Sequence, residues 1–294
     1  MYHSPLRYPG GKALMTNFLM NLFEINGLHD VVYSEPYAGG AGAAINLLLT
    51  DSVSEVIIND ANIGVYSFWY WLLNDSEKFI QTIEDINVTL TEWRKQREIL
   101  KQANEPSLDL GIATFFLSRT NRSGVITGGA IGGASEEKQQ TAHYKIDCRF
   151  NKSALIQRLQ KIVDNKKRIK VFNLDALDFL RQLNQDTFVY LDPPYYAKGK
   201  YLYMNHYTDR NHKDLACYLL NTAPFKWILS YDDTPQIRSL YSSLKLYRFP
   251  LKYTVEKKRT GYELLTHSAN LKFPVKPQIR RYRGKPINIL PIIQ

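Results

Sequence analysis

Residues 31–60 read VVYSEPYAGGAGAAINLLLTDSVSEVIIND, and this stretch decides the fold. Its first part, VVYSEP (31–36), predicts a strand and a turn. The apolar, small-residue segment AGAAINLLL (41–49) lacks a β-branched run and predicts a buried helix. EVIIND (55–60) is continuous and β-branched, as buried strands of parallel sheets are. A strand, a helix and a strand in this order predict two parallel strands joined by a right-handed crossover.

Strands and helices alternate again after residue 167. Predicted strands lie at 168–173, 187–191 and 227–231, and predicted helices at 175–184, 212–222 and 234–242. Two more strands are expected near 244–249 and 261–267, and with no helix between them they predict an antiparallel pair. We therefore expect an α/β fold with a Rossmann-like, doubly wound and mostly parallel sheet that has an antiparallel edge. Ligands of such sheets bind beyond the carboxyl ends of the strands.

The segment between the second and third predicted strands is mostly helical. Apolar residues recur at spacings of three and four in NIGVYSFWYWLLN (62–74), TEWRKQREILKQ (91–102) and LDLGIATFFLSR (108–119). TNRSGVITGGAIGGASEEKQQ (120–140) then predicts a Gly-rich hairpin or loop. The expected organisation is a split α/β domain at 1–62 and 166–270, an inserted helical and hairpin domain at 63–165, and a Pro-containing basic tail at 271–294.

The net charge of the 294 residues is +10, which favours a polyanionic partner because basic patches release counterions from phosphates. No acidic residue follows Glu263, and the basic residues beyond it are Lys272, Lys276, Arg280, Arg281, Arg283 and Lys285. The tail therefore predicts either a disordered phosphate-binding arm or a segment that docks onto another chain. Two cysteines form no disulfide framework, and no apolar run reaches the roughly 18 residues of a membrane span. We expect a cytoplasmic protein with no membrane partner.

Glycines follow the first predicted strand, in SEPYAGGAGAA (34–44). Gly39 and Gly40 permit a tight turn and a close approach of the backbone to a ligand. Asp60 ends the second strand about 20 residues later, where such folds receive ribose hydroxyls. A nucleoside-containing cofactor is therefore expected, and this pair alone leaves NAD open. Asp175, just after the third strand, can accept a hydrogen bond from an adenine amine, cap the following helix, or do both.

The segment LDPPYY (191–196) ends the fourth predicted strand. Its two prolines stiffen the chain and remove backbone donors, so that the Asp192 carboxylate and the Pro193 carbonyl form a fixed pair of acceptors. Tyr195 adds a flat ring. Two acceptors for an amino group beside an aromatic ring describe a site for a flipped nucleobase that reacts at its exocyclic nitrogen. The alternative is a rigid turn between a strand and a helix.

Together, PGGK (9–12), EPYAGGAG (35–42) and DPPY (192–195) resemble the motifs of the Dam-type, S-adenosylmethionine-dependent DNA N6-adenine methyltransferases, in the same order. The resemblance extends from Arg7 to about Leu265. It implies S-adenosyl-L-methionine as the cofactor, double-stranded DNA as the partner and the insertion as a target-recognition domain. It implies a catalytic motif of Asp192, Pro193, Pro194 and Tyr195. It implies cofactor contacts from Tyr8, Gly10, Gly11, Lys12, Glu35, Tyr37, Gly39, Gly40, Asp60, Asp175 and Asp192, with Lys12 near the methionine end.

One position departs from the family pattern. The Gly-rich motif of the family usually has glycine two residues beyond the place of Gly39, and this chain has Ala41 there. A methyl group in that turn could narrow the cofactor pocket. We expect it to be tolerated because Gly40 and Gly42 flank it.

Candidate DNA-contacting residues lie in the insertion and in the loop after the catalytic motif. They are Arg119, Asn121, Arg122, Ser123, Gln139, Gln140, Lys145 and Lys198. Arg can pair with guanine, and Asn or Gln with adenine, in the major groove. For each of them a phosphate contact or a solvated side chain is the simpler alternative. Because TGGAIGG (127–133) departs from the pattern of GATC-specific members, we do not expect GATC as the target.

The expected activity is that of a site-specific DNA adenine methyltransferase that moves the methyl group directly and in line to N6 of a flipped adenine. Two alternatives remain: an RNA N6-adenine methyltransferase, and a catalytically silent, methylase-like DNA-binding regulator for which Ala41 is the only support. A nicotinamide-dependent oxidoreductase ranks last because it has no use for DPPYY. No His, Cys and acid spacing typical of a metal site is present. The candidate protein partner is a cognate restriction or defence-system protein, and the expected location is the nucleoid.

Overall fold

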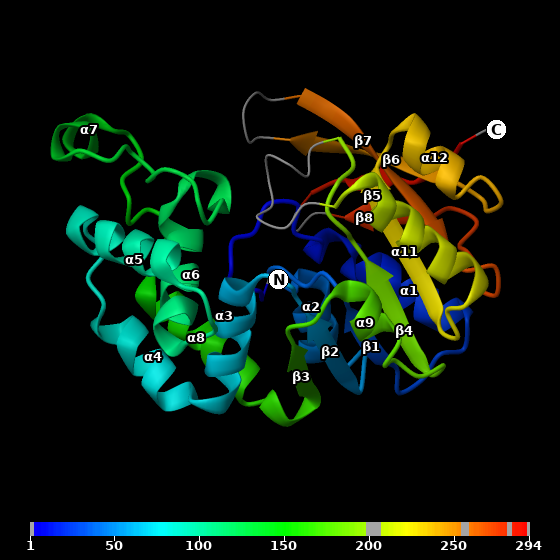
Figure 1. Ribbon diagram of the computed structural model, residues 1–294, viewed down its shortest axis with the longest axis horizontal. Helices are drawn as coiled ribbons and strands as arrows, with labels where there is room; N and C mark the ends of the chain where they lie inside the picture. Colours follow the sequence, from blue (N-terminus) through cyan, green and yellow to red (C-terminus); the bar gives the residue numbers. More distant parts are fainter. Residues whose placement is uncertain (1–2, 198–206, 254–258, 281–283, 293–294) are drawn as a thin grey trace. The chain divides into compact units, whose positions relative to one another are not determined.

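A computed structural model describes residues 3–197, 207–253, 259–280 and 284–292 (Figure 1). The chain divides into two compact units. The first combines residues 12–61 with 168–294 and contains the main sheet, and the second combines residues 3–11 with 62–167 and is helical. Among the described residues, no helix has the length and apolar character needed to cross a membrane.

Within the described residues, the first unit contains an eight-stranded sheet in the order β10-β6-β7-β5-β4-β1-β2-β3. Its parallel strands are β1 (Val32–Glu35), β2 (Glu55–Asn59), β3 (Ile169–Phe172), β4 (Thr187–Leu191) and β5 (Lys226–Asp232). Its antiparallel strands are β6 (Tyr247–Tyr253), β7 (Arg259–His267) and β10 (Leu290–Pro291). This order confirms the predicted Rossmann-like α/β fold with an antiparallel edge.

The strand order reverses at β1, because β2 and β4 lie on either side of it and the chain then continues outward in both directions. In open α/β sheets this switch point creates the crevice in which ligands bind, outside the carboxyl ends of the strands. The sequences that follow β1, β2 and β4 are therefore the segments that the fold brings to one edge.

Helices cover both faces of this sheet (Figure 1). They are η1 (Ala13–Met15), α1 (Thr16–Ile25), α2 (Gly42–Leu49), α9 (Ala176–Leu180), α11 (Asp209–Asn221) and α12 (Pro235–Leu240). Alternate residues of β4 point to opposite faces, as they do in any strand. Phe188 meets Phe23 of α1 at a ring-centroid distance of 4.9 Å, whereas Val189 belongs to the core that α9, α11 and α12 cover. Apolar side chains thus pack between the sheet and its helices on each face.

The second unit contains α3 (Ile63–Asn74), α4 (Ser76–Asp85), α5 (Leu90–Gln102), α6 (Leu108–Thr120), α7 (Glu136–Thr141) and α8 (Lys152–Val163), with η2 (Arg122–Gly124) and, at its end in the sequence, η3 (Lys166–Arg168). Helices α3 and α6 pack closely at Gly111, where a Cβ atom would lie 2.8 Å from the Ser67 carbonyl oxygen. The helical character predicted from the sequence is confirmed. In the Gly-rich stretch, an antiparallel bridge joins Asn121 and Ala130, as in the predicted hairpin.

The described part of the basic tail packs on the first unit, so the predicted disordered arm does not describe it, while docking onto another chain stays a prediction. Strands β8 (Gln278–Arg280) and β9 (Pro286–Asn288) pair with each other, and β10 pairs with β6. Before them, Lys272 exchanges two hydrogen bonds of 2.8 and 2.9 Å with the Asn26 side chain. Phe273 stacks on Tyr247 at 4.2 Å. The reason is apolar burial, because Ile279 and Ile289 are almost fully buried.

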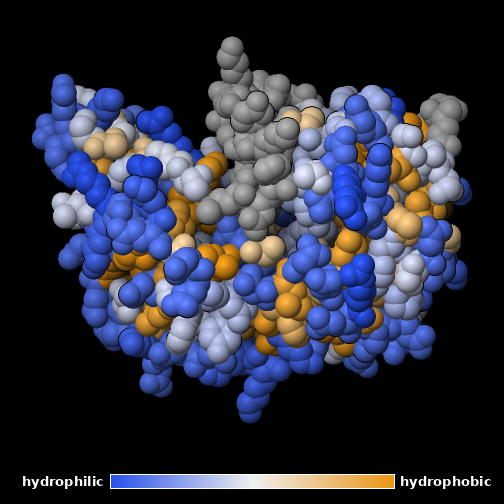
Figure 2. Space-filling model, in the orientation of Figure 1, coloured by the Kyte–Doolittle hydropathy of each residue, from blue (hydrophilic) through white to orange (hydrophobic). Residues whose placement is uncertain are grey.

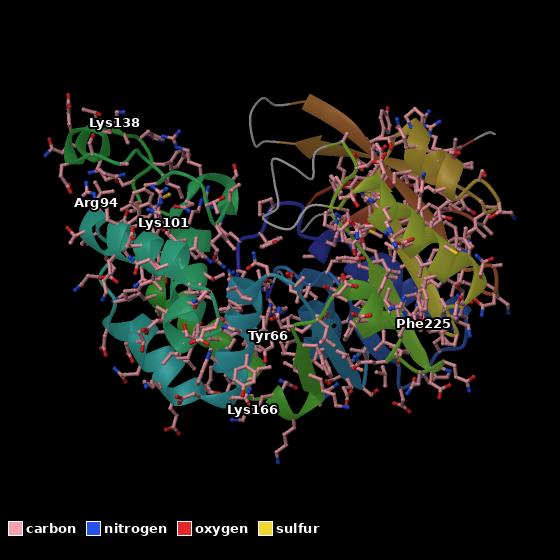
Figure 3. All side chains as sticks on the ribbon, viewed as in Figure 1. Tyr66, Arg94, Lys101, Lys138, Lys166 and Phe225 are labelled. Atoms are coloured by element: carbon pink, nitrogen blue, oxygen red, sulfur yellow. The ribbon has the colours of Figure 1, made fainter. Side chains whose placement is uncertain are left out.

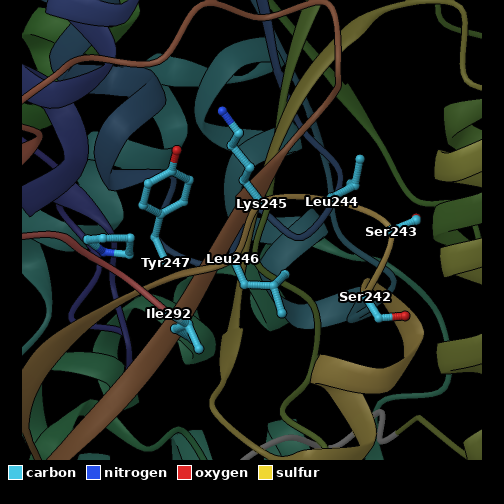
Figure 4. A pocket seen from close by; sticks show the side chains of 8 residues that line it. Ser242, Ser243, Leu244, Lys245, Leu246, Tyr247 and Ile292 are labelled. Carbon is cyan, nitrogen blue, oxygen red and sulfur yellow. The ribbon is translucent and has the colours of Figure 1, made fainter. Parts of the chain in front are cut away.

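Figure 2 shows a mainly hydrophilic surface in this view, with hydrophobic residues scattered among charged ones. A shallow groove of about 380 Å³ lies between residues 242–247 and the tail residues Pro291 and Ile292 (Figure 4). Its lining includes none of the predicted site residues. The predicted catalytic motif lies elsewhere, directly after β4.

Candidate active site

The Gly-rich segment makes a tight turn between β1 and α2. Gly39 and Ala41 both have left-handed backbones, with φ values of +47° and +45°. Helix α2 then begins at Gly42, where a Cβ atom would lie 3.1 Å from the Cβ atom of Ala13. Gly42 thus permits close packing of this turn against Ala13. Ala41 holds a conformation that costs an L-residue roughly 1–2 kcal/mol.

Asp60 follows β2 and lies beside this turn. Its Oδ2 atom accepts a hydrogen bond of 2.7 Å from the backbone N–H of Gly39. The backbone carbonyl of Asp60 accepts a further bond of 2.7 Å from the Asn173 side chain, which fixes the chain after β2. A carboxylate held at the edge of a glycine turn, at the switch point of the sheet, fits the ribose of a nucleoside cofactor.

Asp175 caps helix α9. Its Oδ1 atom accepts hydrogen bonds from the backbone N–H groups of Leu177 and Asp178, at 2.8 and 3.4 Å. The capping role predicted from the sequence is therefore confirmed. The residue is exposed and follows β3, so the predicted contact with an adenine amine stays a prediction.

Glu35 is a buried carboxyl group at the end of β1. It accepts hydrogen bonds from the Tyr33 hydroxyl at 3.0 Å and from the Ala44 backbone N–H at 2.9 Å. Burial raises the pKa of Glu35 to about 8, and the nearby Asp192 carboxylate acts in the same direction. Glu35 therefore ties the end of β1 to the first turn of α2. A direct contact with the cofactor stays a prediction.

The catalytic motif predicted from the sequence follows β4, and Asp192 lies at the centre of a hydrogen-bonded group. Lys12 Nζ lies 2.7 Å from its Oδ2 atom, and the Ser230 hydroxyl donates to its Oδ1 atom at 2.9 Å. Ser230 is in turn 2.8 Å from the Tyr190 hydroxyl. Both carboxylate oxygens are thus held in fixed directions, while the side chain remains 16% exposed.

Tyr195 completes this group together with Glu263 of β7. Its hydroxyl accepts a hydrogen bond of 3.0 Å from Lys12 Nζ and donates one to Glu263. Lys12 Nζ is also 3.5 Å from the second Glu263 oxygen. Burial opposes the charge of Lys12, yet the carboxylates of Asp192 and Glu263 raise its pKa above the usual value. Since Tyr195 is only 2% exposed, this structure uses it as a buried hydrogen-bonding group.

The chain directly after the motif is fixed by Asp232, at the end of β5. Its two carboxylate oxygens accept hydrogen bonds of 2.8 Å each from the backbone N–H groups of Tyr196 and Ala197. The prolines add stiffness, with Pro193 buried and Pro194 partly buried. Lys198, predicted as a DNA contact, lies outside the described residues.

The remaining predicted cofactor residues are divided between the two units. The Tyr37 hydroxyl is 2.6 Å from the Tyr207 hydroxyl, within the first unit. Gly40 is buried in the turn after β1. Tyr8, Gly10 and Gly11 belong to the second unit, where the Gly11 N–H bonds to the Tyr8 carbonyl at 3.2 Å. Of PGGK, Lys12 is thus the residue that the structure places beside Asp192.

Three residues predicted to contact DNA have structural roles instead. Arg119 is 7% exposed and donates through two guanidinium nitrogens to the Pro5 carbonyl. Burial lowers the pKa of Arg119 to about 9. Asn121 is fully buried and accepts a 2.7 Å bond from the Trp93 indole N–H. Gln139 donates to the carbonyls of Ile131 and Gly133 at 2.7 and 2.6 Å. We therefore do not propose that these three side chains read DNA bases.

The other predicted DNA contacts in the second unit lie nearer the surface. Arg122, Gln140 and Lys145 are exposed, and Ser123 is partly exposed with a left-handed backbone of φ +56°. Arg122 Nε donates to the Ala130 carbonyl at 3.3 Å, which leaves the guanidinium at the surface of the hairpin. Their contact with DNA stays a prediction.

The sequence prediction missed Glu263, Asp232 and Ser230, which the structure places around the catalytic motif. Ser230 and Asp232 sit at the carboxyl end of a strand beside the motif, which is the same signal that identified Asp60. Glu263 is a single acid in the apolar run that continues as Leu264 and Leu265. A charged residue in a buried strand is the signal that could have found it.

A comparison with curated proteins found no match. Solved structures do match, among them one of a protein from Pyrococcus horikoshii that is described as a putative RNA methyltransferase. That alignment has 11% sequence identity and a TM-score of 0.41, and it covers 89% of this chain and 83% of the other. The sequence profile of one methyltransferase family matches residues 8–257. The chain therefore belongs to the family of D12 class N6 adenine-specific DNA methyltransferases.

Proposed function

We propose that this protein transfers the methyl group of S-adenosyl-L-methionine to N6 of an adenine in double-stranded DNA, at a defined short sequence other than GATC. The observation that carries the proposal is the Asp192 carboxylate. It follows β4 at the switch point of the sheet, and Lys12 and Ser230 fix both of its oxygens. A partly exposed carboxylate that is oriented in this way can accept a hydrogen bond from the amino group that receives the methyl group.

The first unit offers residues that suit the cofactor. Asp60 would accept the ribose hydroxyls, and the turn at Gly39 and Gly40 would allow the nucleoside to approach the backbone. Asp175 would accept from the adenine amine with the carboxylate oxygen that does not cap α9. The bound cofactor supplies a strongly electrophilic methyl group on sulfur.

The protein need not form a covalent bond to the base. Adenine N6 is a poor nucleophile because its lone pair is delocalised into the ring. Asp192 and the carbonyl of Pro193 would accept its two N–H groups and favour the tetrahedral nitrogen as positive charge develops on it. They would also hold N6 in line with the methyl group. Asp192 need not be a strong base, because N6 becomes acidic once it is methylated.

The second unit would contact the DNA. Its exposed cations include Arg122 and Lys145, and Arg94, Lys101 and Lys138 also lie at its surface (Figure 3). Cations of this kind hold phosphates, and the exposed amide of Gln140 can read a base edge. Phosphate contacts would make DNA affinity fall steeply with salt.

The decisive experiment uses purified protein, labelled S-adenosyl-L-methionine and mixed-sequence duplex DNA, with structured RNA as a second substrate. Methylated positions are read by sequencing. We expect transfer to adenine N6 at one short sequence in the duplex. Transfer to RNA alone would replace the DNA assignment with the RNA alternative. Binding of cofactor and DNA without any transfer would favour the silent regulator.

A further inference from the structure

We propose that Glu263 is a positioning residue whose negative charge balances Lys12, so that the charge of Asp192 acts on adenine N6 and on the methyl donor. This inference rests on the proposed function. It assigns a role to a residue of β7 that lies 71 positions after Asp192 and outside the motifs that identify the family.

The position of Glu263 is set by strand register. Strands β5 and β7 are antiparallel, and Glu263 lies directly opposite Asp232. The side chain is fully buried, in a strand whose next two residues, Leu264 and Leu265, are buried and apolar. A buried carboxyl group is costly unless it is paired. Its partners include Lys12 Nζ, at 3.5 Å, and the hydroxyl of Tyr195.

The charges in this group explain what Glu263 adds. Lys12 lies 2.7 Å from Asp192, so the pair alone is neutral. A neutral pair gives little stabilisation to a positive charge that develops nearby, because the ammonium repels that charge while the carboxylate attracts it. Lys12 Nζ also lies 3.5 Å from Glu263, so an ionised Glu263 would give the group of three one net negative charge. A net negative charge beside Asp192 would stabilise positive charge that develops on N6 and on the methyl donor.

Geometry supports the same role. Tyr195 bridges Lys12 and Glu263 through one hydroxyl, and it belongs to the same motif as Asp192. The Glu263 carboxylate therefore fixes the position of Lys12 from one side and the motif from the other. Glu263→Gln keeps the shape and an oxygen acceptor for Tyr195 while it removes the charge. This substitution separates the electrostatic role from simple packing.

A titration that needs no turnover tests the proposal. Sinefungin has a protonated amine where the cofactor has its methyl sulfonium, and S-adenosylhomocysteine has a neutral thioether there. Both are titrated calorimetrically into the wild-type protein and into Glu263→Gln. We expect the variant to bind S-adenosylhomocysteine as the wild type does and to bind sinefungin about tenfold more weakly. An equal ratio of the two affinities in both proteins overturns the proposal, as does a wild type that binds neither ligand.

The matched control is Glu55→Gln. Glu55 is also a strand glutamate paired with a lysine, with its Oε1 atom 2.7 Å from Lys170, but it lies at the other end of the sheet in β2. Glu55→Gln should leave the affinities for sinefungin and S-adenosylhomocysteine unchanged. A loss of sinefungin affinity in this control as well would show a general charge effect and would overturn the specific role of Glu263.

Single-turnover rates at saturating cofactor and DNA separate this inference from the proposed function. A wild type that methylates no adenine contradicts the proposed function, while the titration still decides the role of Glu263. With an active wild type, the single-turnover rate of Glu263→Gln should be about tenfold lower, and steady-state rates at varied DNA concentration should show little change in KM for DNA. Lys12→Met with Glu263→Gln restores a single negative charge and should be faster than Glu263→Gln alone. A double variant that is slower than Glu263→Gln would contradict the proposed charge balance.

Discussion

Lys12 Nζ and Asp192 Oδ2 lie 2.7 Å apart, although the two residues are separated by 180 positions in the chain. This ion pair joins the N-terminal PGGK segment to the catalytic motif after β4. Lys12 is 5% exposed and Asp192 16%, so the pair is shielded from solvent at the lysine and open at the carboxylate. Two motifs that are far apart in the sequence are therefore in direct contact in the folded chain through Lys12 and Asp192.

Replacing Asp192 with alanine should abolish methyl transfer, by about a thousandfold or more, because the acceptor for N6 is lost. Cofactor and DNA binding should be largely retained, as measured by calorimetry and by gel shift. Asp178→Ala is the control, since its exposed pair with Arg181 lies outside the site. A variant that has lost the fold by circular dichroism would contradict a purely catalytic role.

Glu35 should make stability depend on pH. The pKa of Glu35 is about 8 in the folded state, so the folded chain holds its proton more tightly than the unfolded chain. Its contribution to stability is therefore greatest at low pH and is lost as the pH rises to about 8. Glu35→Gln removes this loss. Between pH 5.5 and pH 8.5, the difference in unfolding free energy between variant and wild type should shift by about 3 kcal/mol in favour of the variant.

Urea unfolding at both pH values measures this effect. Glutamine can still accept hydrogen bonds from Tyr33 and Ala44, so packing around position 35 should be preserved. Glu55→Gln provides the control for a partly exposed glutamate. The same difference at both pH values would contradict a raised pKa for Glu35.

Ala41→Gly should stabilise the protein by about 1 kcal/mol, because Ala41 has a left-handed backbone of φ +45°. Ala43→Gly, inside α2, should instead destabilise it by about 1 kcal/mol. Thermal unfolding of the two variants gives opposite shifts of Tm if the backbone at Ala41 is strained. Calorimetric titration with S-adenosylhomocysteine then tells whether the Ala41 methyl group narrows the cofactor pocket.

Arg119 and Arg122 should behave differently although three positions separate them. Arg119→Met should lower stability by about 2 kcal/mol, since it removes the partner of the buried Pro5 carbonyl. Arg122→Ala should leave stability unchanged and weaken DNA binding, with a shallower dependence on salt. Urea unfolding and DNA titration at two salt concentrations test the pair. Equal loss of DNA affinity in both variants, with stability intact, would restore Arg119 as a DNA contact.

The core of the fold was predictable because its signals are local. A continuous β-branched run marked the strand at 55–60, and the alternation of strands with helices then predicted a parallel sheet. The partners of the catalytic motif were not predictable in the same way. Glu263 reaches Lys12 only because β7 pairs with β5 in one register, and a shift by one residue would turn its side chain to the other face.

The sequence pattern also did not show which residues of the second unit are buried. Helix α6 is buried from Leu110 to Thr120, so its apolar residues define no single face and gave no warning that Arg119 points inward. The tail was misjudged for a related reason. Its basic residues dominate the composition, whereas Phe273, Ile279 and Ile289 determine where it packs.

Strand β10 has a consequence for the behaviour of the protein in a crowded solution. It forms the last strand of the sheet beyond β6, and it consists of Leu290 and Pro291 alone. A strand this short, with a residue that has no N–H group, offers almost no template on which a strand from another molecule could add. Strand β10 thus covers the edge of β6 at Tyr247 and Arg248, and removal of Leu290 and Pro291 would expose the backbone there to pairing with a strand of another molecule.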